Sequence, residues 1–369
     1  MGTIALTGAR GFIGKNLAVR LAEAGHSVVP LAHDLALNEL AEKLAVADFV
    51  VHLAGVNRPE SDAEYETGNV GTSRKLVKAL LSLSKPIPLV YSSSAQAELD
   101  NAYGRSKRAA EQVLNEYGAS AGAPVHIWRL PNVFGKWCRP NYNSVVATFS
   151  HNIARGLPIT INDASTQLRL VYVDDVVDAM LSLIATQGVC TVEVGPIYEI
   201  TLGELAGSLQ HFRDSRRSLM TGPVGRGLQR ALHATFLSYL QPTDFAYDLV
   251  AHTDPRGIFV EMLRTADAGQ FSFFTAHPGI TRGGHYHHSK TEKFLVLQGQ
   301  ARFGFRNILT DETFVLEIDG ATPRVVETVP GWSHDITNIG DGTMIVMLWA
   351  NEVFDSDRPD TVAARVLLQ

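Results

Sequence analysis

The sequence predicts a chain of two domains, a doubly wound α/β domain followed by an all-β barrel. The 369 residues exceed the size of one typical domain. The N-terminus runs from a short apolar strand through a glycine loop into a helix, whereas from about residue 253 the pattern changes to short alternating strands with Gly, Asp and Asn turns. We therefore place one domain at residues 1–245 and the other at residues 253–369, with residues 238–252 as the connection.

Composition and charge exclude several kinds of partner. The formal net charge is −6, which offers no basic field to attract nucleic acid or a membrane surface. Cys138 and Cys190 are too few for a disulfide framework and wrongly placed for a zinc knuckle. Met1 leads almost directly into a strand pattern, without room for a signal peptide, and no apolar run approaches the roughly 18 residues that span a bilayer. We expect a cytoplasmic protein that binds neither nucleic acid nor membrane.

The first motif is a glycine loop between a strand and a helix. Thr3–Thr7 is a short apolar run, and Gly8, Gly11 and Gly14 follow it in the spacing T-G-x-x-G-x-x-G. In this setting the first glycine permits a tight turn, the second lets backbone approach a pyrophosphate, and the third lets the helix pack on the strand. The helix N-terminus then faces the phosphates. We expect a dinucleotide to contact the loop residues Gly8, Arg10, Gly11, Phe12, Ile13 and Gly14.

The end of the second strand favours NADP over NAD. An NAD enzyme places an acidic residue there to bind the ribose hydroxyl. Strand Ser27–Leu31 is followed by Ala32 and His33, and Arg10 lies in the glycine loop, so a 2′-phosphate is better tolerated. Asp34, two residues after Ala32, keeps NAD open as the alternative. The third buried strand adds Leu53, Ala54 and Gly55 to the expected cofactor contacts, which also include His33, Tyr103 and Lys107.

Two residues on one helical face predict an acid–base pair. Tyr103 and Lys107 are four residues apart, shortly after strand Leu89–Ser94, which ends in three serines. We expect the ammonium to lower the pKa of the tyrosine from about 10 toward neutrality, which would make Tyr103 a proton donor or acceptor for an alcohol–ketone pair. The Ser94 hydroxyl would hold the carbonyl. The alternative is that Tyr103 and Lys107 are ordinary residues of a helix without a catalytic role. The glycine loop and the serine-ended strand disfavour that alternative.

These features resemble the extended short-chain dehydrogenase/reductases from Met1 to about Tyr239. The family's landmarks occur in its order: TGxxGxxG, HLAG (52–55), Asn69, SSS (92–94), YGRSK (103–107), RLPNVFG (129–135) and VYVDDVVDA (171–179). The resemblance implies a Rossmann fold, the catalytic set Ser94, Tyr103 and Lys107, and a nucleotide-sugar substrate. The residues expected at the substrate are Asn57, Arg58, Asn132, Lys136, Asn141, Asn143 and Arg169.

Two details on the substrate side narrow the expected chemistry. Lys136 and Arg169 can neutralise a diphosphate, although either can equally be a solvated surface charge. Dehydratases of this family follow the serine strand with an Asp-Glu pair, where this chain has Ala95-Gln96. We therefore expect reduction of a ketosugar or 4-epimerisation rather than dehydration.

Gly279–Gly299 carries the pattern G-x5-H-x-H-x4-E-x6-G, with His285, His287 and Glu292 at its fixed points. Because they are two residues apart, the two histidines would project from one face of a strand. Downstream, Pro330-Gly331 would turn the chain to present His334. Three imidazoles and one carboxylate suit zinc, iron, manganese or nickel. We expect one divalent ion per chain, with zinc as first choice, and a histidine-rich surface loop is the alternative.

The two histidine segments resemble the first and second motifs of the cupin family, with the usual P-x-G of the second contracted to Pro330-Gly331. The phrase DPRGIFVE (254–261) resembles the start of the dTDP-4-keto-sugar 3,5-epimerases, which are themselves cupins. That resemblance implies that Arg256 and Glu261 help hold a nucleotide sugar. Tyr286, His288 and Lys290 are candidates for the base, without a ranking.

The whole chain resembles the CapF type of bifunctional enzyme from capsule and O-antigen synthesis. The similar stretches are HLAGVNRPE, LPNVFGKWCRPNYNSV, GGHYHHSKTEKF and WANEVFD. The resemblance implies that the cupin inverts carbon 3 of a UDP-4-keto-6-deoxy-N-acetylhexosamine. The reductase then reduces carbon 4 with NADPH, giving UDP-N-acetyl-6-deoxy-L-talosamine on the route to UDP-N-acetyl-L-fucosamine. A homodimer is the expected assembly. Two alternatives stay open: a 4-epimerase that retains NAD, and a cupin that only binds sugar or metal and regulates or dimerises the reductase.

Overall fold

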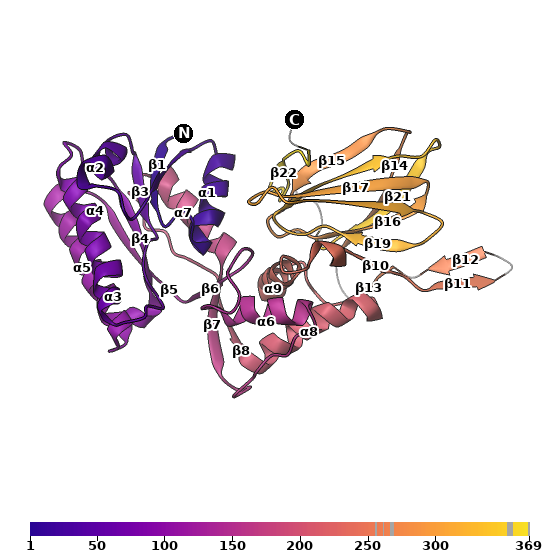
Figure 1. Ribbon diagram of the computed structural model, residues 1–369, viewed down its shortest axis with the longest axis horizontal. Coiled ribbons are helices and arrows are strands. Elements are labelled where there is room, and N and C mark those ends of the chain that lie inside the picture. Colours follow the sequence, from indigo (N-terminus) through magenta and orange to yellow (C-terminus); the bar gives the residue numbers. More distant parts are fainter. Residues whose placement is uncertain (255–256, 261, 266–268, 353–356, 368–369) are drawn as a thin grey trace. The chain divides into compact units, whose positions relative to one another are not determined.

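The protein is described by a computed structural model that covers residues 1–369 apart from 255–256, 261, 266–268, 353–356 and 368–369. The chain divides into two compact units, drawn in Figure 1. The first comprises Met1–Ser144 and Leu168–Ile200, and the second comprises Val145–Gln167 and Thr201–Gln369. Among the described residues, no helix is long and apolar enough to cross a membrane.

The first unit is built on a five-stranded parallel sheet in the order β2-β1-β3-β4-β5. Its central strands are short apolar runs buried on both faces, as parallel strands between helical layers usually are. The strands are β1 (Thr3–Thr7), β2 (Ser27–Leu31), β3 (Phe49–His52), β4 (Leu89–Ser94) and β5 (Val125–Leu130). This arrangement confirms the doubly wound fold, and it leaves β2 at one edge of the sheet.

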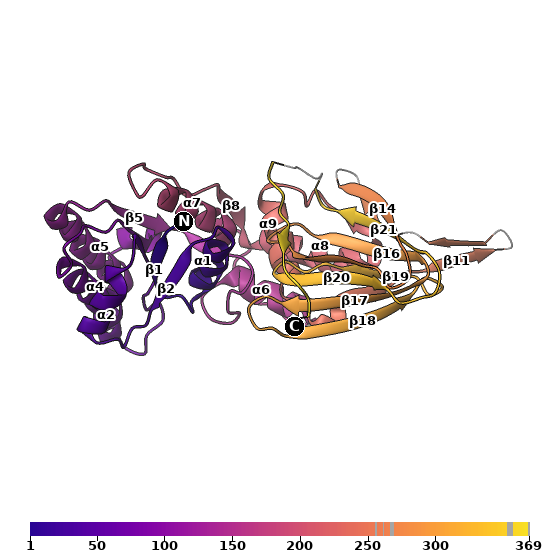
Figure 2. The same ribbon diagram turned by 90° about the horizontal axis from the view of Figure 1, so that it is seen from above.

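Helices cover both faces of this sheet (Figures 1 and 2). α1 (Phe12–Glu23) packs with α7 (Val173–Ala185) on one face. On the other face α2 (Leu37–Ala45), α4 (Thr72–Leu81) and α5 (Ala102–Ala121) share a core of leucines with the strands. The remaining elements are α3 (Ala63–Tyr65), a π-helical turn (Glu66–Gly71), a 3-10 turn (Ala95–Glu98), and a small sheet of β6 (Asn132–Phe134), β7 (Gln167–Tyr172) and β8 (Ile197–Thr201).

The second unit contains two five-stranded sheets, in the orders β10-β19-β16-β21-β14 and β18-β17-β20-β15-β22. Their neighbouring strands are antiparallel, and residues from both sheets line one interior cavity, so the sheets form the walls of a barrel. This confirms the all-β fold. The strands are β10 (Ala246–Asp248), β14 (Gln270–Ala276), β15 (Thr281–Tyr286), β16 (Glu292–Gln298), β17 (Gln300–Asn307), β18 (Thr313–Asp319), β19 (Arg324–Glu327), β20 (Trp332–Asn338), β21 (Met344–Ala350) and β22 (Val362–Ala363).

Helices α6 (Val145–Ala154), α8 (Leu202–Ser218) and α9 (Gly227–Leu237) belong to the same unit and pack on one another. A buried ionic network fastens α8 to the barrel, because Arg216 and Lys293 both pair with Glu327. β10 lies inside the stretch 238–252 expected as a connection, and it pairs with β19. Smaller elements are a 3-10 turn (Pro242–Asp244), the hairpin β11 (Ala251–Asp254) with β12 (Gly257–Val260), and the pair β9 (Met220–Thr221) with β13 (Arg264–Thr265).

Candidate functional site

The glycine loop joins β1 to α1 in a conformation that requires glycine. Gly8 has a φ of +67°, and a Cβ there would lie 2.9 Å from the backbone nitrogen of Ala54. A Cβ on Gly14 would lie 2.2 Å from the carbonyl oxygen of Gly8. The loop therefore packs directly against the end of β3, and the amino end of α1 lines a cleft. This backbone cradle fits the pyrophosphate of a dinucleotide.

A cleft of about 650 Å³ lies at the carboxyl ends of the parallel strands. It brings together most of the residues that the sequence assigned to cofactor, catalysis and substrate. Those lining it are Gly8, Arg10, Gly11, Phe12, Ile13, Gly14, Leu53, Gly55, Asn57, Ser94, Tyr103, Lys107, Asn132, Asn143 and Arg169. The residues expected at the site that do not line the cleft are His33, Ala54, Arg58, Lys136 and Asn141.

The three expected catalytic side chains meet in this cleft. Ser94 ends β4, and Tyr103 and Lys107 lie one turn apart on α5. The Lys107 ammonium is buried, and it donates to the Ser92 carbonyl at 3.0 Å and to the Tyr91 hydroxyl at 3.1 Å. Its Nζ atom is 5.9 Å from the centroid of the Tyr103 ring. The catalytic role of this group stays a prediction, but the geometry holds a hydroxyl, a phenol and an ammonium around one position.

The pKa of Tyr103 is raised, so the expected lowering toward neutrality is wrong. Burial raises this pKa most, and a hydrogen bond with Ser94 only partly opposes the effect. The Lys107 ammonium is too distant and too engaged with other oxygens to overcome burial. Burial in turn lowers the pKa of Lys107 to about 8. Tyr103 therefore keeps its proton at neutral pH and is suited to act as an acid.

Asn69 ties the end of β3 to α5 from within the π-helical turn. Its side-chain oxygen accepts the Val56 N–H at 2.8 Å, and its amide donates to the Ser106 hydroxyl at 2.9 Å. A Cβ on Gly55 would lie 2.7 Å from the Asn69 oxygen, so only glycine fits beside it. The buried asparagine thus fixes the loop that borders the cleft near Lys107. Wide π turns of this kind often occur at functional sites.

The structure pairs Lys136 with Asp174 instead of presenting it to a diphosphate. Lys136 is 1% exposed, and its Nζ lies 2.6 Å from the Asp174 carboxylate. Burial makes this pairing necessary, because an unpaired ammonium is costly away from water. Arg169 does line the cleft, where it lies 3.7 Å from an exposed Glu199. Arg169 is thus the better candidate for an anionic substrate group.

Lys75 is a cation on the cofactor side that no sequence motif marks. It lies on α4, and its Nζ donates to the carbonyl oxygen of His33 at 3.3 Å. His33 follows β2, where enzymes of this fold bind the ribose 2′ group. No local pattern could have found this contact, because the two residues are 42 positions apart. It arises because β2 is an edge strand beside α2, against which α4 packs.

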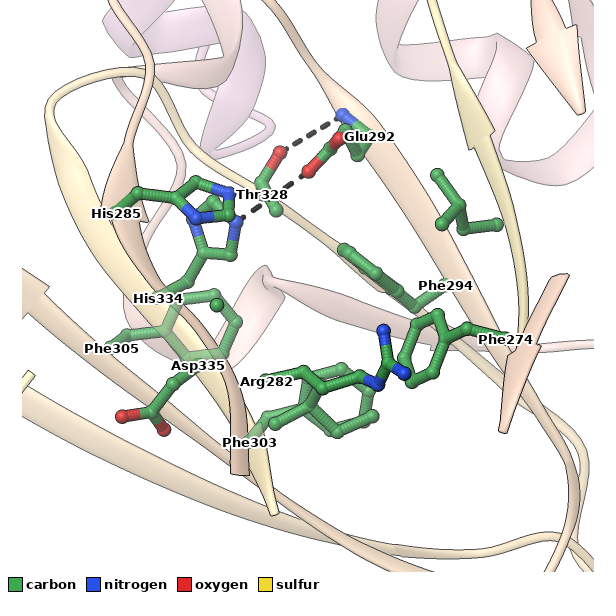
Figure 3. A pocket seen from close by; sticks show the side chains of 13 residues that line it. Phe274, Arg282, His285, Glu292, Phe294, Phe303, Phe305, Thr328, His334 and Asp335 are labelled. Atoms are coloured by element: carbon green, nitrogen blue, oxygen red, sulfur yellow. Dashed lines mark hydrogen bonds and ion pairs between the residues drawn. The ribbon is translucent and has the colours of Figure 1, made fainter. Parts of the chain in front are cut away.

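Three of the expected metal ligands, His285, Glu292 and His334, line the barrel cavity and are drawn in Figure 3, and His287 groups with them. His285 lies on β15, His287 follows that strand, Glu292 begins β16, and His334 lies on β20. Their ligand atoms all lie within 4.8 Å of one another. The Oε2 atom of Glu292 is 3.2 Å from Nε2 of His287 and 3.5 Å from Nε2 of His334. Residues 49 positions apart at the extremes thus converge on one point.

The protonation states of Glu292, His285 and His334 suit a cation. Burial alone would raise the pKa of Glu292, but its interactions with His287 and His334 hold that pKa well below its usual range. Burial, together with the neighbouring imidazoles, lowers the pKa of His285 to about 4. Burial also lowers the pKa of His334. Neutral imidazoles around an ionised carboxylate are the forms that bind metal ions.

The donor set fits one divalent ion. Ligand atoms at the usual 2.0–2.1 Å from a tetrahedral zinc stand roughly 3.3 Å apart, close to the two separations from Glu292. Both ring nitrogens of His334 are buried without a regular hydrogen bond among the described residues. Buried polar atoms ordinarily have a partner, so this imidazole is suited to an additional ligand. Zinc itself stays a prediction.

A glycine bulge turns Arg282 and His285 toward the same cavity. In a regular strand, residues three apart face opposite sides. The register of β15 against β20 shifts between these two residues, and the two glycines that separate them have φ angles of +99° and +75°. Their partners on β20, Ile336 and His334, are two apart and so share a face. The bulge therefore places a guanidinium in the same cavity as the imidazoles.

The cavity has a volume of about 200 Å³. The Arg282 guanidinium lies over the Phe274 ring, 5.2 Å from its centroid, and Figure 3 shows this pair away from the imidazoles. No described carboxylate forms an ion pair with Arg282. A small ligand would thus meet cationic and metal-binding groups across a wall of apolar side chains: Phe294, Phe303, Phe305, Ile336 and Leu348.

None of the expected base candidates is among the described residues that line the cavity. Tyr286 and His288 are buried, with ring centroids 5.4 Å apart. The Lys290 ammonium lies 3.3 Å from Oε1 of Glu292. Arg256 and Glu261, the residues expected to hold a nucleotide sugar, fall outside the described residues. The identity of a base therefore stays open.

Comparisons with known proteins agree with both halves of this description. Residues 4–195 match the NAD dependent epimerase/dehydratase family, and residues 252–362 match the polysaccharide biosynthesis C-terminal domain. The chain is 56% identical over 366 residues to the UDP-2-acetamido-2,6-beta-L-arabino-hexul-4-ose reductase of Pseudomonas aeruginosa, covering 98% of each chain. The fold of the chain also resembles that of a UDP-N-acetylglucosamine 4-epimerase from Bacillus cereus, with a TM-score of 0.51 and 20% identity over 58% of this chain and 82% of that one.

A solved structure matches the whole architecture. The capsular polysaccharide assembling protein CapF from Staphylococcus aureus aligns with a TM-score of 0.67 and 42% identity. The match covers 98% of this chain and 100% of that chain, so it includes both the parallel sheet and the barrel. The chain therefore belongs to the NAD-dependent epimerase/dehydratase family and, over its full length, to the CapF type of capsular polysaccharide enzymes.

Proposed function

We propose that the protein is a bifunctional nucleotide-sugar enzyme. The barrel inverts carbon 3 of a UDP-4-keto-6-deoxy-N-acetylhexosamine, and the doubly wound unit reduces the carbon 4 ketone with NADPH. The product is UDP-N-acetyl-6-deoxy-L-talosamine, on the route to UDP-N-acetyl-L-fucosamine. The observation that carries the proposal is the 56% identity to a protein named as a reductase of a UDP-linked 6-deoxy-4-ketosugar. Two chemically distinct sites within one chain support the two steps.

The hydroxyl-rich cleft is suited to the reduction. Bound in the glycine cradle, NADPH supplies a hydride for carbon 4. Tyr103 gives its proton to the carbon 4 oxygen, which its raised pKa favours because the phenol is still protonated at neutral pH. Ser94 donates a hydrogen bond to the same oxygen. The Lys107 ammonium, held by Ser92 and Tyr91, stabilises the negative charge left on the tyrosine.

NADPH is favoured by two cations near the expected ribose. Arg10 lines the cleft beside the glycine loop, and Lys75 lies at the carbonyl of His33 beyond β2. A 2′-phosphate between them would gain charge-assisted hydrogen bonds. Neither residue would gain comparably from the 2′-hydroxyl of NADH.

The barrel cavity is suited to proton exchange next to a ketone. Held by His285, His287, Glu292 and His334, a divalent metal supplies Lewis acidity for the ketone oxygen. Such polarisation would make the neighbouring carbon 3 proton acidic enough to be taken by a base, and a proton exchanged with solvent would then be added on the other face. The phenylalanine wall excludes water and accepts the methyl group of a 6-deoxy sugar, and Arg282 faces the anionic part of the substrate.

The direct test supplies a UDP-4-keto-6-deoxy-N-acetylhexosamine and NADPH in deuterated water. We expect deuterium at carbon 3 of the product by NMR, and one NADPH consumed per product. Reduction without deuterium incorporation would mean that the barrel only binds sugar or metal. A carbon 4 epimer formed without consumption of NADPH would instead indicate an epimerase that retains NAD.

Chelation of the metal separates the two steps within the same assay. We expect a chelator to abolish deuterium exchange at carbon 3, whereas reduction of a ketosugar supplied already inverted continues, since the Tyr103 cleft contains no metal ligand set among its described residues. Full exchange in protein shown by elemental analysis to be metal-free would contradict a catalytic role for the ion. Readdition of zinc restores the exchange if the loss is due to the metal.

A further inference from the structure

The chain returns to its metal-binding turn about 70 residues after leaving it. We propose that Asp360 is a positioning residue for the metal centre, which orients the ligand His287 and holds the turn His288–Lys290 that connects His287 to Glu292. The proposal rests on the metal site of the proposed function. It assigns a role to a segment that carries no metal ligand and that no sequence motif marks.

The main-chain carbonyl of Asp360 fixes the tautomer of His287. The Nδ1 atom of this imidazole contacts that carbonyl oxygen. Because a carbonyl only accepts, Nδ1 must carry the proton, and the lone pair is left on Nε2. Nε2 is the atom that lies 3.2 Å from Glu292 Oε2 in the ligand cluster. His287 is 1% exposed, so its orientation is set by protein groups and not by solvent.

The Asp360 carboxylate organises the turn that follows. One oxygen accepts the N–H of His288 at 2.8 Å. The other accepts the N–H groups of Ser289 and Lys290, both at 2.7 Å, and the Ser289 hydroxyl at 2.9 Å. Three consecutive backbone N–H groups converging on one carboxylate form an anion-binding concavity. The carboxylate is 12% exposed, so these bonds are largely shielded from water.

The residues after Asp360 hold a second ligand. Strand β22 pairs with the end of β15, where Ala363 lies opposite His285. The Ala364 N–H donates to the Gly284 carbonyl at 2.8 Å, beside the bulge that turns His285 inward. One short segment therefore contacts the backbone at both ligands of the H-x-H pair. Its position determines how far these ligands stand from Glu292 and His334.

A cation from the helices of the same unit supports this segment. Arg230 on α9 lies 3.6 Å from the Asp360 carboxylate and 3.3 Å from Glu352. The guanidinium offsets the charge that Asp360 brings to a mostly buried place. Removing the carboxylate would leave Arg230 with Glu352, so the variant need not bury an unpaired charge. This makes Asp360 a site at which positioning can be tested without destroying the fold.

The test compares metal affinity in full-length Asp360→Ala, Asp360→Asn and the control Asp341→Ala, which removes an exposed carboxylate elsewhere in the barrel unit. Zinc dissociation constants are measured by competition with a chromogenic chelator. We expect Asp360→Ala to bind zinc about 10–100-fold more weakly, as for other residues that orient a ligating histidine. Asp360→Asn, which keeps one oxygen acceptor, should show a smaller loss, and Asp341→Ala none.

Cobalt spectra and thermal melting of the metal-free proteins separate positioning from bracing. We expect the visible absorption of the cobalt-loaded Asp360 variants to shift. Metal-free Asp360→Asn, which keeps an oxygen acceptor for the turn, should melt close to Asp341→Ala, whereas Asp360→Ala leaves the N–H groups of the turn without their acceptor and should melt lower. Unchanged affinity and spectrum would overturn the proposal while leaving the metal site intact. A metal-free Asp360→Asn that melts far below the control would show that the segment braces the barrel instead. If wild-type protein binds neither ion, the metal site of the proposed function fails, and this proposal fails with it.

Discussion

The cleft of the first unit and the cavity of the barrel are assembled from the chain in opposite ways. In the cleft, the expected catalytic set lies between Ser94 and Lys107, on one strand and the helix that follows it. In the barrel, the expected metal ligands come from β15, the turn after it, β16 and β20, and one of them, His287, contacts Asp360 near the other end of the domain. The geometry of a site within one short segment is set by the local structure of that segment. The geometry of a site built from several strands is set by the register between those strands.

The two sites also differ in electrostatics. The cleft buries an ammonium among neutral hydroxyls, which lowers the pKa of Lys107 to about 8. The cavity buries a carboxylate among imidazoles, which holds the pKa of Glu292 low. In the proposed function, the cleft therefore gives a proton to an oxygen, and the cavity holds a cation beside a ketone. Because each site has its own charged groups, we expect that a substitution can abolish the activity of one site without loss of activity at the other.

The largest expected effect is the loss of reduction in Tyr103→Phe. The substitution removes the proton donor and leaves the ring, so we expect NADPH-dependent reduction to fall on the order of a hundredfold or more. Deuterium exchange at carbon 3 should continue at the wild-type rate, because it depends on the barrel. Both rates are measured on one preparation, by NADPH absorbance and by NMR.

Tyr117→Phe is the matched control for Tyr103→Phe. Tyr117 lies on the same helix, but its hydroxyl bonds the backbone of Ile87 within the core. Its loss should lower stability slightly and leave reduction intact. A Tyr103→Phe protein that reduces the ketosugar at a rate like that of Tyr117→Phe would contradict the assignment of the proton donor.

How much of each site the sequence could predict follows from how that site is assembled. The glycine loop, the serine-ended strand and the Tyr103–Lys107 pair were predictable, because strand, turn and helix patterns place neighbours in sequence on one face. The H-x-H pair was predicted on one strand face, yet β15 ends at Tyr286. His287 lies in the turn instead, where its orientation is set from Asp360.

What the sequence missed depends on burial and on contacts between distant residues. The pKa of Tyr103 moves opposite to expectation, because desolvation outweighs a charge that spacing alone places nearby. In the sequence, nothing marks Lys136 as paired, but in the structure it is buried and forms an ion pair with Asp174. Lys75 meets His33 only because of the order of the strands and the packing of α4. None of these features has a local signature in the sequence.

An intermediate effect is expected for cofactor choice, which tests whether the cleft also depends on distant residues. Lys75→Ala removes a cation from the expected 2′-phosphate position, so the preference for NADPH over NADH should shrink by roughly tenfold, the low end for a charged hydrogen bond. Arg10→Ala should act similarly. Binding of 2′,5′-ADP against 5′-AMP, followed by calorimetry, measures the same difference without turnover.

Lys78→Ala provides the comparison for Lys75→Ala, because it removes an exposed lysine one turn further along α4. We expect no change in its coenzyme preference. Equal binding of the two nucleotides by wild-type protein would rule out the 2′-phosphate site. If Arg10→Ala changes the coenzyme preference and Lys75→Ala does not, Lys75 has no part in that preference. The preference would then depend only on the residues of the glycine loop.

The smallest expected effect is a decline of reduction above pH 8, and it tests the electrostatic difference between the sites. Lys107 loses its proton as the pH rises through about 8, because burial disfavours its charged form. Tyr103 stays protonated in this range, since its pKa is raised. The decline should therefore follow the loss of the Lys107 ammonium, with kcat/KM for reduction falling about fivefold between pH 8 and pH 9. Carbon 3 exchange, measured at the same pH values, should show no such decline from Lys107, because that residue belongs to the other unit. A rate of reduction that does not change up to about pH 9.5 would mean that reduction does not need the charge on Lys107. The cleft would then not depend on a buried charge in the way that the barrel cavity does.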